Sequence, residues 1–176
     1  MRHPKRDEDA RQFFQQDIKG YKQEGYKLAY IDESGFAYDM PRTHGYSLKG
    51  QACYGKQDWH AKGCTNAIGA LIGKALLTVG LFPCNITSDI FNIWLKHDLL
   101  PKLKEPTVII LDNAAFHKRK DTQEMIKKAG HILLFLPPYS PDFNPIEKKW
   151  AQLKKMRRKI QCSIDELFNI ESFYSG

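Results

Sequence analysis

The chain has 176 residues, of which 42% are apolar and 27% charged, which excludes a mainly disordered chain and leaves room for one well-packed domain. Its net charge of +7 and isoelectric point near 9.2 favour a polyanionic partner. The apolar runs are too short to span a membrane and the N-terminus has no signal-peptide pattern, so we expect a cytoplasmic protein with no membrane partner.

The first half of the chain is expected to be rich in strands. Residues 1–25 are polar and predict an N-terminal helix or linker, with an amphipathic helix from about Glu8 to Tyr21. A single domain is expected over residues 26–176. Its first strand should run from Lys27 to Ile31 and stop at Asp32, because Asp-Glu-Ser-Gly is a typical turn sequence. Further strands are predicted at residues 45–54, 65–72 and 75–82.

Helices and strands alternate in the second half. A helix is predicted over residues 88–100, with Ser88 as its N-cap. The apolar run at residues 107–111 suits a strand buried on both faces, and it ends at Asp112. A helix at residues 121–129 and a strand at residues 132–136 follow.

Prolines then mark a rigid loop, which leads into two more helices. The longer is expected to begin with Asn144 as N-cap and Pro145 in the first turn. The shorter should begin with a capping box formed by Ser163 and Glu166. Strands followed by strand–helix alternation predict an α/β fold, a mixed sheet with helices on both faces.

Asp32 and Asp112 share one context, since each follows an apolar strand. If the two strands are neighbours, both carboxylates face one crevice beyond the strand ends. Two such carboxylates repel, and a divalent cation such as Mg²⁺ relieves the repulsion. The alternative is that each aspartate only caps a turn.

Glu147 is the third residue after Asn144. It could therefore reach back to the backbone of Asn144 as in a capping box, or serve as an ionised carboxylate on a rigid helix, as a metal site requires. His117 follows Asp112 by five residues. No serine or cysteine lies in the setting of a nucleophile, so we expect Asn113 and His117 to support the carboxylates or contact phosphate.

Seven of the twelve residues from 148 to 159 are basic and could contact the phosphates of a polyanionic partner or form a solvated helix face. They are Lys148, Lys149, Lys154, Lys155, Arg157, Arg158 and Lys159. The four cysteines form no Cys-x-x-Cys pair, so a zinc site built from Cys53, His60 and Cys64 is not expected.

Three segments together resemble one protein family. They are Tyr-Ile-Asp-Glu-Ser-Gly-Phe at residues 30–36, Leu-Asp-Asn-Ala at 111–114 with His117, and Leu-Pro-Pro-Tyr-Ser-Pro at 136–141 running into Asn-Pro-Ile-Glu at 144–147. With 34 residues between Asp112 and Glu147, the pattern resembles the DDE transposases of bacterial insertion sequences related to mariner elements. The resemblance covers residues 8–168.

The resemblance implies a ribonuclease H-like, retroviral integrase-like fold in which Asp32, Asp112 and Glu147 are catalytic and hold two Mg²⁺ or Mn²⁺ ions. It implies cleavage of double-stranded DNA at transposon ends and transfer of the freed 3′-hydroxyl to a target, typically a TA dinucleotide. It also implies a homodimer in the active complex. Relatives usually carry an N-terminal helix-turn-helix region, which this sequence lacks, so a separate helix-turn-helix partner chain is expected.

Two alternatives to the transposase remain open. One is another ribonuclease H-like nuclease, such as a junction resolvase, and the other is a catalytically idle DNA-binding relic of a degenerate element. We also expect the metal-free carboxylates to repel one another, so that Asp112→Asn leaves the metal-free protein at least as stable as the wild type.

Overall fold

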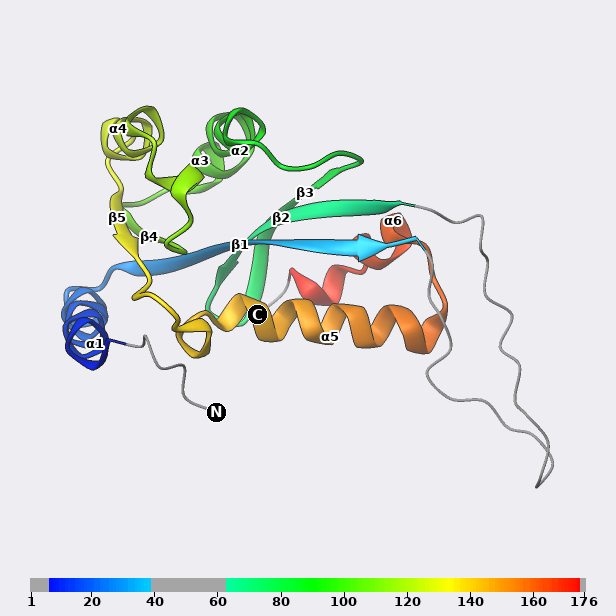
Figure 1. The fold of residues 1–176 in the computed structure, drawn as a ribbon, viewed down its shortest axis with the longest axis horizontal. Helices are drawn as coiled ribbons and strands as arrows, with labels where there is room; N and C mark the ends of the chain where they lie inside the picture. The colour runs from blue at the N-terminus through cyan, green and yellow to red at the C-terminus, as the bar shows by residue number, and fades with distance from the viewer. Residues whose placement is uncertain (1–6, 39–62, 175–176) are drawn as a thin grey trace, which may run out of the picture.

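The computed structural model describes residues 7–38 and 63–174, and Figure 1 shows a central five-stranded sheet within this part. The strand order is β3-β2-β1-β4-β5. The strands are β1 (Lys27–Ala37), β2 (Cys64–Ile72), β3 (Ala75–Phe82), β4 (Thr107–Leu111) and β5 (Ile132–Phe135). The strand predicted at residues 45–54 lies outside the described residues, as do Cys53 and His60.

The sheet is mixed, as predicted. Strands β1, β2 and β3 are antiparallel, whereas β1, β4 and β5 are parallel. The prediction that the first strand stops at Asp32 is wrong, because β1 continues for five residues to Ala37. Antiparallel pairing with β2, from Asp32–Gly69 to Ala37–Cys64, satisfies the backbone of a segment whose sequence alone favours a turn.

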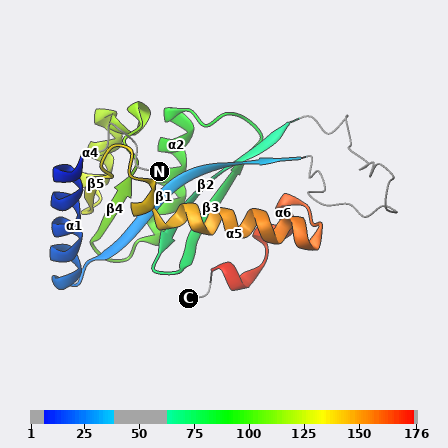
Figure 2. The same ribbon diagram turned by 60° about the horizontal axis from the view of Figure 1, so that its bottom comes forward.

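Helices cover both faces of this sheet (Figures 1 and 2). On one face lie α2 (Ser88–Trp94), a π-helical segment at Leu95–Leu99, α3 (Leu100–Lys102) and α4 (Lys120–Lys128). On the other lie α1 (Glu8–Gln23), α5 (Pro145–Ile160) and α6 (Ile164–Phe168). Short 3₁₀ helices occupy Ala115–Lys118, Pro141–Phe143 and Glu171–Phe173.

The helix boundaries follow the sequence signals with one correction. Thr87, and not Ser88, caps α2, and its hydroxyl accepts a hydrogen bond from the Ile90 amide. The capping box of Ser163 and Glu166 is confirmed at α6. Gly130 takes a φ of +83° after α4, a conformation that glycine adopts without strain.

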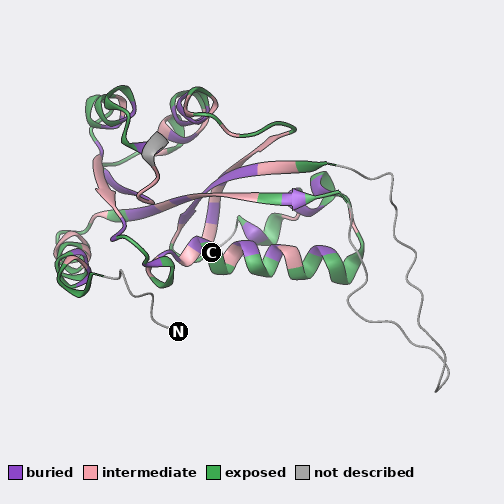
Figure 3. Cartoon of the chain, in the orientation of Figure 1, coloured by how far each residue is buried: buried purple, intermediate pink, exposed green. Residues whose placement is uncertain are grey.

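Three apolar clusters hold the layers together. One, with Ile31, Ile109 and Leu111, lies between the sheet and the helices α2 and α4. A second joins β1 and β2 to α5 and α6, and a third packs Phe14 of α1 against Leu28. Figure 3 shows the buried residues concentrated in the strands and on the inner sides of the helices. Helix α1 lies where an amphipathic helix was predicted, from about Glu8 to Tyr21, and it packs on the sheet.

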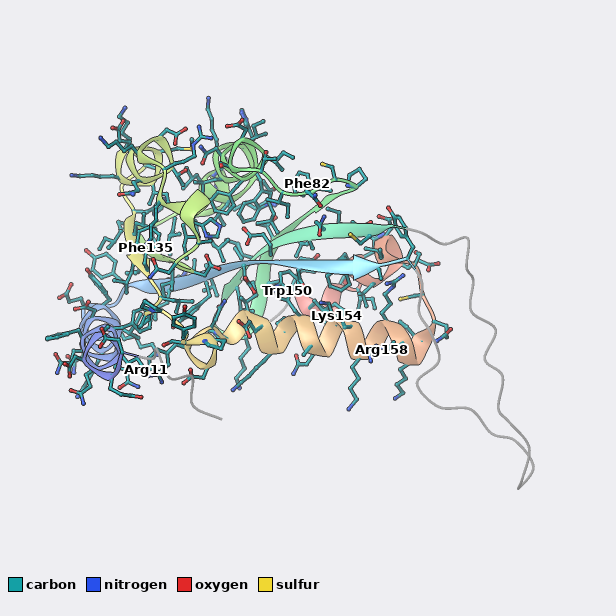
Figure 4. All side chains as sticks on the ribbon, in the orientation of Figure 1. Arg11, Phe82, Phe135, Trp150, Lys154 and Arg158 are labelled. Atoms are coloured by element: carbon teal, nitrogen blue, oxygen red, sulfur yellow. The ribbon has the colours of Figure 1, made fainter. Side chains whose placement is uncertain are left out.

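Helix α5 approaches the sheet very closely at Gly69. A Cβ atom built there would lie 2.5 Å from Trp150, so only glycine allows this contact. Figure 4 shows Trp150 between α5 and the sheet. Because Gly69 pairs directly with Asp32, the close approach brings the first turn of α5 beside that aspartate.

Cys64, Cys84 and Cys162 are free thiols. Among the described residues, no helix has the length and apolar character needed to cross a membrane.

Candidate active site

One open cavity of about 480 Å³ is lined by all three predicted carboxylates, those of Asp32, Asp112 and Glu147. Its other walls come from the turn after β4, with Asn113, Ala114 and Lys118, and from residues 136–141 and Asn144 before α5. Residues separated by as many as 115 positions thus surround one solvent-filled space.

The pairing register explains why the two aspartates meet. In the parallel pair β1–β4, Lys27 lies opposite Thr107 and Tyr30 opposite Ile110. Continuing this register places Asp32 beside Asp112, one residue beyond the end of β4. Neighbouring strands lie about 4.8 Å apart, so this register accounts for Asp32 and Asp112 lining the same cavity.

Glu147 enters the cavity from the first turn of α5. The proposed capping box at this position is absent: the Asn144 amide donates to the Pro141 carbonyl at 2.9 Å, and no side chain caps the helix. Burial and the charge of Asp112 raise the pKa of Glu147. Its carboxylate is therefore not explained by helix capping.

Asp112 is held by a relay of buried contacts. His117 is completely buried, and its Nδ1 lies 2.7 Å from Asp112 Oδ1 while its Nε2 lies 3.0 Å from Glu33 Oε1. The Ala114 amide also donates to Asp112 Oδ1, at 2.9 Å. Asp112 thus caps its turn, as the alternative proposed, and faces the cavity as well.

The titration behaviour follows from these contacts. Burial alone would lower the pKa of His117, but its hydrogen bonds with Asp112 and Glu33 outweigh burial and raise the pKa to about 9. The hydrogen bond from His117 in turn lowers the pKa of Asp112, against the opposing effect of burial. The pair is therefore an imidazolium and a carboxylate at neutral pH.

Asp32 has the opposite electrostatic setting. Burial is the main cause that raises its pKa, to about 7, and the nearby carboxylates of Glu33, Glu147 and Asp112 contribute in that order. A raised pKa from burial and neighbouring negative charge marks a site that is ready to accept a cation.

The donor set fits a hard divalent cation in chemistry. Carboxylate oxygens from Asp32, Asp112 and Glu147 are the ligands that Mg²⁺ and Mn²⁺ prefer. Asn144 adds an observation: it is 3% exposed, and its Oδ1 is buried with no hydrogen-bond partner, as expected of an acceptor for a bound water. Over residues 7–38 and 63–174, no three acidic, His or Cys side chains are close enough to hold a metal ion without rearrangement.

The seven basic residues of α5 do not share one environment. Arg157 is buried, and its guanidinium donates to the carbonyls of Ala37, Tyr38 and Cys162. Its assignment as a DNA contact is therefore corrected, because the side chain fastens α5 to the end of β1. Lys149 reaches the Lys74 carbonyl at 3.0 Å, on the flank of the helix away from Glu147.

The other five basic residues remain accessible on two sides of α5. Lys154 and Arg158, which are labelled in Figure 4, follow Glu147 at positions i+7 and i+11 and so lie on the same flank of the helix. Lys148, Lys155 and Lys159 are exposed on the side opposite the sheet.

Sequence reasoning missed three residues at this site. Glu33 orients His117, and only its position beside Asp32 could have indicated this role. Lys118 lines the cavity and follows His117 directly. Tyr139 also lines it, with a φ of +54° that is uncommon for a residue with a side chain and marks local backbone strain.

The fold and site together define a class. The sheet order, its helices on both faces and the carboxylates at its centre constitute the ribonuclease H-like fold, as predicted. Residues 27–167 match the family described as DDE superfamily endonuclease, and the chain belongs to that family. A comparison with curated protein sequences found no match.

Solved structures support the fold. A paired-end complex of the mariner Mos1 transposase with Mg has a TM-score of 0.70 at 17% identity, over 99% of this chain and 59% of that chain. The Mos1 catalytic domain has a TM-score of 0.63 at 12% identity, over 100% and 86%. The simian T-cell lymphotropic virus intasome matches with a TM-score of 0.55 at 13% identity, over 81% and 45%. The chain spans about half the length of the first Mos1 chains it matches.

Proposed function

We propose that the chain is the catalytic domain of a DNA transposase, which cleaves DNA at transposon ends and transfers the resulting 3′-hydroxyl to target DNA. The observation that carries the proposal is the meeting of Asp32, Asp112 and Glu147 in one cavity of a DDE-family fold. The Mos1 structures, which include paired-end and strand-transfer complexes, support the same reaction class.

Asp32, Asp112 and Glu147 would hold the divalent cations, proposed to be two Mg²⁺ or Mn²⁺ ions. When bound, such ions activate the attacking oxygen and stabilise the leaving oxygen at phosphorus. The support for this proposal in the chain itself is chemical. Three carboxylates line one cavity, and one of them, that of Asp32, has a pKa raised to about 7 by burial and by its negative neighbours.

The surrounding residues have separate tasks in this proposal. His117 would keep Asp112 ionised and fix the direction of its carboxylate before a cation binds. The buried Oδ1 of Asn144 would accept a hydrogen bond from a water in the cavity. Lys118 on the cavity wall would contact a phosphate of the bound strand.

The DNA backbone would leave the cavity along α5. Lys154 and Arg158 continue the flank that begins with Glu147, and Lys148, Lys155 and Lys159 extend the positive surface on the outer side. Contacts of this kind provide affinity without reading sequence. We include in the proposal a homodimer in the active complex, a separate helix-turn-helix partner chain and a TA target, whose easy deformation would permit indirect readout.

The test is a cleavage and strand-transfer assay on labelled duplexes that carry the element's terminal repeats. Wild-type protein should nick these duplexes and join the 3′ end to a target, in Mg²⁺ or Mn²⁺ and not in EDTA. Glu147→Gln should abolish both steps while the domain stays folded. Glu124→Gln makes the same change on the exposed side of α4 and should leave both steps intact.

The outcomes separate the competing functions. Nicking without strand transfer would point to another ribonuclease H-like nuclease, and no metal-dependent cleavage by folded wild-type protein would point to an idle DNA-binding relic. Cleavage by Glu147→Gln at the wild-type rate would remove Glu147 from the proposed site.

A further inference from the structure

Helix α1 lies outside the family match, which begins at residue 27, yet it contacts the turn in front of Glu147. Arg11 donates from Nη1 and Nη2 to the two carboxylate oxygens of Asp142, at 3.1 and 2.7 Å. The two residues are 131 positions apart in sequence. In Figure 4, Arg11 lies beside the turn that leads into α5.

This contact is built into the core of the protein. The Arg11 side chain is only 7% exposed, and its guanidinium lies 3.8 Å from the centroid of the Phe143 ring. One turn further along α1, the ring of Phe14 stacks on the same Phe143 at a centroid distance of 5.6 Å. Two side chains of α1 thus hold two consecutive residues of the turn.

Backbone hydrogen bonds connect the turn to the residues that line the catalytic cavity. The Asn144 amide donates to the Pro141 carbonyl at 2.9 Å, and the Glu147 amide donates to the Asn144 carbonyl at 3.3 Å. Pro141 and Pro145 fix the backbone φ on either side. A displacement of Asp142 or Phe143 would therefore move Asn144 and Glu147 with it.

The choice of arginine indicates a geometric role. Burial of a charge gives little net stability, even when the charge is paired, so stability alone is a weak reason for this ion pair. Arginine can bind a carboxylate at two points and stack on a ring at the same time, which lysine cannot do. Both contacts are present here.

We propose that Arg11 is a positioning residue: through Asp142 and Phe143, it holds the Pro141–Phe143 turn so that Asn144 and Glu147 face the catalytic cavity. The effect on catalysis rests on the proposed transposase function. The immobilisation of the turn by α1 does not depend on that function.

The first experiment measures amide hydrogen exchange in EDTA, without DNA. Arg11→Met should speed exchange at residues 142–147 by about tenfold or more, because the turn opens locally, while the amides of α4 stay protected. Lys19→Met removes one positive charge from the exposed side of the same helix and should change nothing in the turn. Should Arg11→Met not fold, Arg11→Lys keeps the charge and loses the two-point contact.

The second experiment measures cleavage with metal at a temperature where every variant is folded. Arg11→Met and Asp142→Asn should each lower kcat by about tenfold with little change in KM for DNA. The double variant should be no worse than either single variant, since the two residues act as one unit.

Unchanged exchange in the turn would overturn the inference, as would a variant that loses global stability but keeps the wild-type kcat. If the wild-type protein does not cleave DNA, the proposed function fails, and the exchange experiment alone still decides whether Arg11 holds the turn.

Discussion

Asp32 and Asp112 lie next to each other in the sheet register, but the protein treats them in opposite ways. Asp112 is stabilised as an anion by His117 and by the Ala114 amide, so its pKa is lowered. Asp32 has neighbouring carboxylates and is more deeply buried, so its pKa rises to about 7. In the proposed metal site, the Asp112 carboxylate would be ionised before a cation binds, whereas the Asp32 carboxylate would be stabilised as an anion only by the cation.

This difference shows which carboxylate is destabilised by the negative charges of the site. His117 lies between the carboxylates of Asp112 and Glu33, whereas the charges that raise the pKa of Asp32 are the carboxylates of Glu33, Glu147 and Asp112. The repulsion expected between the carboxylates therefore acts mainly on Asp32. The contact between His117 and Asp112 argues against the expectation that Asp112→Asn relieves it, since that change removes a negative charge beside a buried imidazole ring.

For catalysis, we expect substitution of either aspartate to have a similar effect. Asp32→Asn and Asp112→Asn should each lower the rate of metal-dependent nicking by about 10³-fold or more, because a metal ion contributes several kcal/mol to the transition state. Single-turnover nicking of a labelled duplex measures this. Substantial activity in one variant would show that only the other aspartate serves the reaction.

Removal of His117 should have an intermediate effect. His117→Gln keeps a hydrogen-bonding side chain but loses the positive charge, and we expect metal affinity or activity to fall by about 10- to 100-fold. Metal titration of the nicking rate separates the two contributions. A normal metal response would mean that Asp112 needs no support from His117.

Without metal, substitutions of the two aspartates should change the free energy of unfolding in opposite directions. In EDTA at pH 8, Asp32→Asn should raise the free energy of unfolding by about 1–3 kcal/mol, because it removes a carboxylate with a raised pKa. Asp112→Asn should lower it. Urea denaturation measures both, and a shift in the same direction for the two variants would contradict the electrostatic comparison.

The dependence of stability on pH follows with a defined sign. The folded pKa of Asp32 is raised to about 7, so the wild type should lose stability as pH rises from about 4 to 7. His117 has a folded pKa of about 9, so its contribution is complete below about pH 6.5 and is lost as pH rises toward 9. Thermal melts in EDTA across this pH range test both statements. Asp32→Asn should not lose stability between pH 4 and 7, and His117→Gln should not lose stability as pH rises toward 9.

The smallest effect is expected on the basic face of α5. Neutralising Lys154, Lys155 and Arg158 together should flatten the slope of log affinity against log salt by about 2–3, since each phosphate contact contributes about 0.9. Arg157→Met should lower stability and leave this slope nearly unchanged, because the side chain is buried. Filter binding at several salt concentrations tests both statements.

The sequence predicted the fold well because its signals are local and strong. The apolar run before Asp112, the glycine after α4 and the capping box at Ser163 each specify an element without help from distant residues. The mistaken end of the first strand has a non-local cause, because the partner strand β2 compensates for a turn-like sequence. Sequence periodicity contains no information about that partner.

The site was predictable in its carboxylates and much less so in their surroundings. Asp32, Asp112 and Glu147 follow a spacing that a family shares, whereas Glu33 and Asn144 gain their roles from burial and from direction. Arg157 illustrates the limit of sequence reasoning for the basic residues, since a basic run alone does not indicate which side chain is buried against the sheet. Helical geometry places it on the inner stripe with Trp150 and Leu153.

The register that joins β1 to β4 also has a consequence for the order of folding. The hairpin of β2 and β3 closes through the two residues Gly73 and Lys74, whereas the contact between Lys27 and Thr107 spans 80 positions. Short closures form early and distant parallel pairings form late. We therefore expect the aspartates to come together late in folding, so that the proposed catalytic centre is incomplete in a nascent or partly folded chain.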